Sequence, residues 1–162
     1  MSREHMFRRR AGVGQLLAGL LGLAVVSLVA LAEPSLSKEP LYSSGGLAVS
    51  GYDVVAYFND GKPVEGRPEY ATEWSGARWR FATAANRDAF VANPTRYTPQ
   101  YGGYCAYAVS KGYTASADPM AWRIVDGRLY LNYSKSVQRL WEQDIPGHIA
   151  NANGNWPAVL AK

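Results

Sequence analysis

The chain has 162 residues, with 17 basic and 13 acidic side chains, and its formal net charge is +4. This length suggests one domain, or one domain and a tail. Residues 1–32 hold four of the arginines against a single glutamate, so the rest of the chain is nearly neutral and has no basic run, which leaves nucleic-acid binding without support.

A basic, apolar segment opens the chain. Three arginines at positions 8–10 precede residues 11–32, which carry no charge and end in Ala30-Leu31-Ala32. This pattern is typical of a cleaved signal peptide, but a run of about 20 apolar residues is also long enough for an uncleaved membrane anchor. We therefore interpret 1–32 as a signal peptide or a membrane anchor that forms an apolar helix. The remaining chain is expected to be exported to the periplasm, either soluble or tethered to the inner membrane through residues 11–32.

Residues 33–46 are predicted to be a linker, and residues 47–162 a single folded domain. The linker has two prolines, four serines and the pair Gly45-Gly46, with no periodic apolar pattern.

The first half of the domain contains strand, hairpin and helix patterns. Residues 54–58 are rich in strand-forming side chains and are followed by the turn sequence Asn59-Asp60-Gly61. The runs 70–74 and 78–81 flank Ser75-Gly76-Ala77 and predict a hairpin. Thr83 is the expected N-cap of a helix over 84–93, which Pro94 ends.

The second half of the domain also contains helix and hairpin patterns. After an aromatic, glycine-rich loop over 97–104, residues 105–111 predict a short helix, and the pair Asp126-Gly127 predicts a hairpin between 122–125 and 128–131. A last long helix is expected to begin after Asn132 or Ser134, to end at Pro146, and to be followed by one more turn over 148–152. The fold class is α+β, with a small antiparallel sheet of hairpins and two to four short helices.

The chain has one cysteine, Cys105, which cannot form an intramolecular disulfide. It is buried and inert, or bonded to the cysteine of another chain in a Cys105-linked dimer, or a working thiol. Its position at the start of a short helix is one where the helix dipole lowers the pKa of a thiol and favours the thiolate.

Other side chains are candidates to work with Cys105, each with a structural alternative. His148 and Met120 could ligate a soft metal or support redox chemistry, although such residues are more often structural or packing groups. Lys111 could stabilise a thiolate or be a solvated lysine, and Asp53 could line a site or cap a turn. The pocket candidates are Tyr52, Asp53, Tyr101, Tyr104 and Lys111.

The hairpin and helix of the first half carry a recognisable pattern, made of Trp74, Gly76, Trp79, Phe81, Phe90, Asn93, Pro94 and Tyr97. This pattern resembles the YHS domain. The wider chain is similar to exported bacterial proteins that contain a YHS domain, through Gly51-Tyr52-Asp53, 101–106 and 129–133.

The resemblance implies soft-metal chemistry only in part. Many members carry cysteines suited to copper, zinc or mercury, but the matching positions here are Ala56, Ala82 and Asn86, which supply no thiolate. In the exported subfamily the position of Cys105 can hold selenocysteine, which implies a need for a chalcogen nucleophile, redox centre or soft ligand.

Three hypotheses follow. The first is a YHS-like domain that binds copper or another soft metal ion, or does thiol redox work, through Cys105. The second is a non-catalytic module that binds a protein partner and merely buries Cys105. The third is a small enzyme of unknown reaction.

Overall fold

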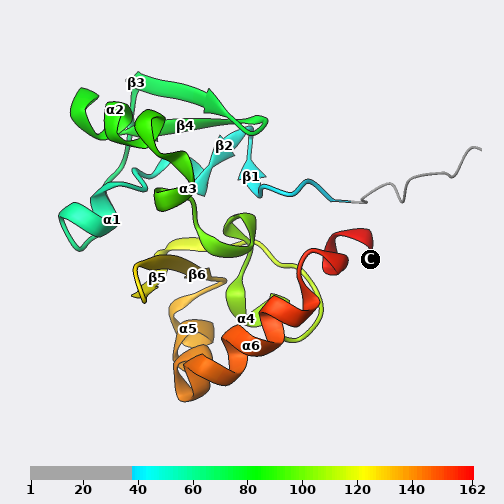
Figure 1. Ribbon diagram of the computed structural model, residues 1–162. Coiled ribbons are helices and arrows are strands. Elements are labelled where there is room, and N and C mark those ends of the chain that lie inside the picture. The colour runs from blue at the N-terminus through cyan, green and yellow to red at the C-terminus, as the bar shows by residue number, and fades with distance from the viewer. Residues whose placement is uncertain (1–37) are drawn as a thin grey trace, which may run out of the picture. The chain divides into compact units, whose positions relative to one another are not determined.

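The computed structural model describes residues 38–162, which form an α+β fold (Figure 1). The segment 1–32, predicted to be a signal peptide or anchor, lies outside the described residues. None of the helices within 38–162 is long and apolar enough to cross a membrane.

A four-stranded sheet occupies the N-terminal half. It has the order β1-β2-β4-β3, with β1 (Ser43–Ser44), β2 (Leu47–Ala48), β3 (Arg67–Trp74) and β4 (Ala77–Phe81). The β3–β4 hairpin is antiparallel as predicted, whereas β2 runs parallel to β4. The expectation of a purely antiparallel sheet was therefore wrong, because a strand earlier in the chain joins the free edge of the hairpin.

Helices α2 (Ala84–Ala92) and α3 (Pro94–Tyr97) follow the hairpin, and α2 packs on β3 and β4. The Thr83 side chain accepts a hydrogen bond from the backbone N–H of Asn86, which confirms the predicted N-cap. The ring of Phe90 lies 4.8 Å from that of Trp79 and 5.1 Å from that of Phe81. These aromatic contacts fix the helix on the sheet.

The C-terminal half is built on a second hairpin, β5 (Asp118–Val125) and β6 (Arg128–Asn132). The 3-10 helix η2 (Gln100–Gly103) and helix α4 (Ala106–Ser110) precede the hairpin. Helix α5 (Lys135–Trp141), the 3-10 turn η3 (Glu142–Asp144), helix α6 (Ile145–Asn155) and the 3-10 helix η4 (Ala158–Ala161) follow it.

Strand β6 separates two apolar clusters. Because side chains alternate along a strand, Leu129 and Leu131 face the cluster of the four-stranded sheet, while Tyr130 faces the cluster of η2, α4 and α6. In Figure 1 the hairpin accordingly lies between the two groups of elements. One strand therefore contributes side chains to the clusters of both halves.

Three details differ from the sequence predictions. Residues 54–58 do not form a strand; they lead into helix α1 (Ala56–Asn59). Pro146 stands in the first turn of α6, where a missing N–H costs nothing, so it begins a longer helix than expected. The described residues also contain more helices than the two to four predicted.

The expected linker is also partly wrong. Leu41 is buried in the core, Ser43–Ser44 pair with β2, and the N–H of Lys38 donates to the carbonyl of Leu160. From residue 38 onward, the segment assigned to the linker is part of the domain.

Candidate functional site

The tight loop η2 places Cys105 at the N-cap of α4. Tyr101, Gly102 and Gly103 all have positive φ, with values of 56°, 59° and 80°. Only glycine adopts this region freely, so the two glycines allow the chain to reverse within a few residues. The N–H of Cys105 then donates to the carbonyl of Ala115 at 3.0 Å, which fixes the start of the helix.

The Cys105 sulfur accepts backbone hydrogen bonds from two elements. The N–H of Ala108, in the first turn of α4, lies 3.5 Å from Sγ. The N–H of Tyr133, just after β6, lies 3.2 Å from it. The thiol is therefore both the helix cap and a link between α4 and the end of β6.

Asn132 is the third neighbour of the sulfur. Its Oδ1 lies 3.9 Å from Sγ and accepts a hydrogen bond from the backbone N–H of Tyr107 at 3.2 Å. The N–H of Tyr107 fixes the orientation of the Asn132 amide, because a flipped amide would point its NH₂ group at this N–H, and two donors do not form a hydrogen bond. Oδ1 is therefore the end of the amide that faces the thiol. Asn132 is fully buried, and its Nδ2 has no hydrogen-bond partner in the part of the chain that the structure describes.

Burial favours the protonated form of Cys105. Burial raises the pKa of the Cys105 thiol, and the hydrogen bonds from Ala108, Tyr133 and Tyr107 lower it by a smaller amount. The predicted lowering by the helix dipole is therefore wrong in its net direction, because α4 is only five residues long and Cys105 is 1% exposed. The S–H donor faces Asn132 Oδ1.

A small apolar pocket opens beside the sulfur. Its volume is about 260 Å³, and two of its walls are tyrosines at the surface, Tyr113 and Tyr133, which are 52% and 57% exposed. The pocket is lined by Cys105, Tyr107, Ala108, Tyr113, Ala115, Tyr133 and Val137.

The predicted metal or redox partners do not join Cys105. The Nδ1 of His148 lies 3.2 Å from Ser110 Oγ, and its ring meets the Tyr107 ring edge-on at 5.1 Å. Met120 lies on β5 and is 42% exposed. Within residues 38–162 no group of three or more His, Cys, Asp or Glu side chains is placed to hold a metal ion.

The five pocket candidates do not share one pocket. Lys111 lies over the face of the Tyr107 ring at 5.1 Å and lines a different cavity, together with Ser110 and Gly112. The hydroxyl of Tyr101 donates to Asn153 Oδ1, and that of Tyr104 donates to the carbonyl of Glu39. Tyr52 contacts Glu65, with 3.4 Å between its hydroxyl and Oε1.

Asp53 is a structural centre of the N-terminal half. It is fully buried, and its carboxylate accepts four hydrogen bonds from elements on either side of the sheet hairpin. The capping alternative accounts for the contacts with Val55 and Ala56, whereas those with Ala82 and Asn86 join distant parts of the chain.

Sequence reasoning missed five residues of the pocket: Ala108, Tyr113, Ala115, Tyr133 and Val137. It treated Asn132 as a helix cap and as part of the family pattern, and not as a neighbour of Cys105. The alternation in β6 carried a usable signal, because Asn132 shares its face with the buried Tyr130, where a polar side chain needs a partner.

No protein-family model matches the chain, and comparison with curated proteins and with solved structures finds no match.

Proposed function

We propose that this protein is an exported YHS-like domain whose function is thiol redox chemistry at Cys105. The basic and apolar segment 1–32 supports export as a secreted or membrane-tethered protein. The motif around β3, β4 and α2 supports the family, and the pocket beside Sγ supports the chemistry.

The observation that carries the proposal is the sulfur at the helix cap. Ser, Thr, Asp and Asn are the favoured N-cap residues, because an oxygen makes a shorter and stronger hydrogen bond to the helix N–H groups. The Sγ of Cys105 lies 3.5 Å from the N–H of Ala108, which a serine oxygen would satisfy as well or better. A sulfur that is a poor cap and also lines a pocket is explained by its reactivity.

The proposed step is oxidation by a small organic hydroperoxide, whose apolar group suits the tyrosine-lined pocket. Cys105 first loses its proton to solvent base. The thiolate attacks one peroxide oxygen, the S–O bond forms as the O–O bond breaks, and the departing alkoxide takes a proton from water. The sulfur gives up two electrons and becomes a sulfenic acid, while the hydroperoxide is reduced to an alcohol.

The backbone N–H groups of Ala108 and Tyr133 give this step its stabilisation. Both already point at the sulfur, so they are in place to stabilise the negative charge of the thiolate without reorganisation. The raised pKa makes the reaction slow at neutral pH and faster in mildly alkaline solution.

The test compares the native full chain with the Cys105→Ser variant. After treatment with tert-butyl hydroperoxide, a sulfenic-acid-specific dione is added and the adduct is located by mass spectrometry. We expect an adduct at residue 105 in the wild type and none in Cys105→Ser, which retains the helix cap. If the native chain gives no adduct while the urea-unfolded chain does so at the same pH, the cysteine is buried and inert.

Copper(I) binding is tested in the same samples. A lone thiolate supplies too few ligands for a closed site, so a copper site would need water or the Cys105 of a second chain. The metal function would be established instead if the wild type binds copper, Cys105→Ser does not, and the bound copper sediments with a dimer of the protein.

The protein-interaction alternative has one observation in its favour. Tyr113 and Tyr133 are large side chains at the surface that line the pocket, each more than half exposed. If Tyr133→Ser abolishes partner capture while Cys105→Ser does not, the domain is an interaction module and the thiol is structural.

A further inference from the structure

The outer face of strand β4 carries two arginines. Ala77, Trp79 and Phe81 of this strand are buried, so the alternate residues Arg78 and Arg80 point away from the core. This face is separate from the Cys105 pocket, because the two cavities share no lining residue.

The two arginines differ in their partners. The Nε of Arg78 donates to Glu73 Oε1 at 2.7 Å across the hairpin, in an exposed ion pair. Arg80 has no ion pair within residues 38–162, and its Nε is buried without a hydrogen-bond partner there. A buried, unsatisfied donor on a charged group is unfavourable, so the site around Arg80 is incomplete without an acceptor.

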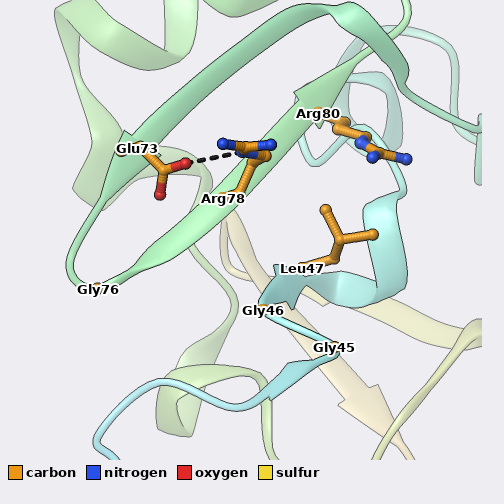
Figure 2. Close-up of a pocket in the computed structure, with 7 residues that line it drawn as sticks. All are labelled: Gly45, Gly46, Leu47, Glu73, Gly76, Arg78 and Arg80. Carbon is orange, nitrogen blue, oxygen red and sulfur yellow. Dashed lines mark hydrogen bonds and ion pairs between the residues drawn. The ribbon is translucent and has the colours of Figure 1, made fainter.

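A cavity of about 380 Å³ adjoins both arginines. Figure 2 shows Arg78 turned toward Glu73 and Arg80 turned away from that pair, with the Leu47 side chain below Arg80 and the Gly45-Gly46 turn at the edge. The cavity thus has charged side chains on one wall and one apolar side chain, that of Leu47, and glycine backbone forms the rest of its lining.

Glycines shape the rim of this cavity. Gly45, Gly46 and Gly76 line it, and no atom lies within 4 Å of the position that a Cβ would take at any of the three. A ligand can therefore approach the backbone closely. The carbonyl of Gly46 accepts the N–H of Arg78 at 3.0 Å, which holds the turn beside the arginines.

We propose that this cavity is a binding site for a small oxyanion, a carboxylate or a phosphate group, held by the guanidinium of Arg80. A guanidinium presents two parallel N–H donors to such a group, and the acceptor would satisfy the unpartnered Nε of Arg80. Glu73 limits the affinity, because its carboxylate repels the ligand and occupies Arg78.

The test measures thermal unfolding of the full chain in inorganic phosphate and, separately, in acetate, with sodium chloride at equal ionic strength as the reference. A ligand that binds the folded state raises the unfolding temperature as its concentration rises. We expect phosphate, acetate or both to raise it by several degrees more than chloride. The more effective anion identifies the source of the oxyanion.

Four variants make the test specific. Arg80→Gln should abolish the anion-dependent rise, Arg80→Lys should reduce it because a single ammonium lacks the fork of donors, and Glu73→Gln should increase it. Arg139→Gln removes one exposed positive charge elsewhere and should respond like the wild type.

Two results would overturn the proposal. One is an equal response of the wild type and Arg80→Gln, which would mean that the anions act on the whole protein surface. The other is a wild type that responds to phosphate and acetate no more than to chloride. If Arg80→Gln does not fold, Arg80→Lys and Glu73→Gln still decide between these outcomes, since they must shift the response in opposite directions.

Discussion

Asp53 offers the sharpest test of how this fold is held together. Its Oδ1 accepts the N–H groups of Val55 at 2.9 Å and Ala56 at 3.3 Å, and its Oδ2 accepts the N–H of Ala82 at 2.8 Å and the Asn86 amide at 2.7 Å. Every one of these partners is a donor. The carboxylate therefore joins the start of α1 to the segment that connects β4 and α2.

In Asp53→Asn, one oxygen becomes an NH₂ group that faces two donors, whichever way the amide turns. Each buried donor left unsatisfied costs about 1–3 kcal/mol. We therefore expect a loss of about 4 kcal/mol in the free energy of unfolding, a large fraction of the stability of a small domain. Urea unfolding of the full chain, followed by circular dichroism, measures this loss.

Two further variants separate this explanation from a general effect of charge. Asp60→Asn removes an exposed carboxylate from the same region and should change the stability by less than about 0.5 kcal/mol. Asp53→Asn combined with Asn86→Asp restores one donor–acceptor pair and should recover part of the loss. A loss below about 1 kcal/mol in Asp53→Asn alone would refute the assigned network.

The remaining predictions concern the loop before α4 and the response to pH. Gly102→Ala should lower the free energy of unfolding by about 3 kcal/mol or more, because the new Cβ would overlap the carbonyl of Pro40. Gly61 has a similar φ but no neighbour at that position, so Gly61→Ala should lower it by only about 1 kcal/mol. Urea unfolding measures both losses. Alkylation of Cys105 by a small uncharged reagent should keep accelerating above about pH 8.5, and a plateau below that value would contradict the raised pKa. Burial raises the pKa of Tyr101 to about 12, so the stability it contributes is complete below about pH 10 and is lost as the pH rises toward 12; unfolding titrations should show a smaller alkaline loss in Tyr101→Phe.

Local turn chemistry explains why both hairpins could be predicted from the sequence. Ser75-Gly76 and Asp126-Gly127 each adopt positive φ at both turn positions, the conformation that suits a two-residue hairpin. The Thr83 cap is equally local. In these segments the neighbouring residues alone select the structure, and tertiary contacts agree with them.

The segment after Asp53 shows where local preference fails. Val54 and Val55 favour a strand, yet the Asp53 carboxylate accepts the N–H groups of Val55 and Ala56 and so begins a helix. The same carboxylate is held in place by Ala82 and Asn86, about thirty residues away. No local pattern contains those contacts, so a strand was the reasonable but incorrect expectation.

The candidate site also combines features that follow from the local sequence with features that depend on distant residues. The position of Cys105 at the start of a helix follows from Gly102, Gly103 and the apolar residues after them, and the sequence predicted it. The groups that set the state of the thiol, Asn132 and Tyr133, come from the end of a strand that is distant in the chain. Burial among such distant elements reverses the expected direction of the pKa shift, and it depends on a pairing that single-sequence patterns do not specify.

Asn132 therefore gives the most direct control over the proposed chemistry. Its Oδ1 accepts the thiol proton and also the N–H of Tyr107, so it stabilises the neutral thiol and occupies a donor that lies close to the sulfur. Asn132→Ala removes the acceptor and frees that donor, which should lower the pKa of Cys105 and speed its alkylation at neutral pH, at a cost of about 1–3 kcal/mol in stability.

Asn132→Asp should act in the opposite direction. A carboxylate 3.9 Å from the sulfur would repel the thiolate and raise the pKa of Cys105 further, so alkylation should be slower than in the wild type at every pH below the new value. Rates are compared on folded samples, with circular dichroism as the check on folding. If both variants change the rate in the same direction, they act by loosening the fold, and Asn132 does not set the charge of the thiol. Opposite changes would show that the Asn132 side chain adjusts the pKa of Cys105 in addition to the raising that burial causes.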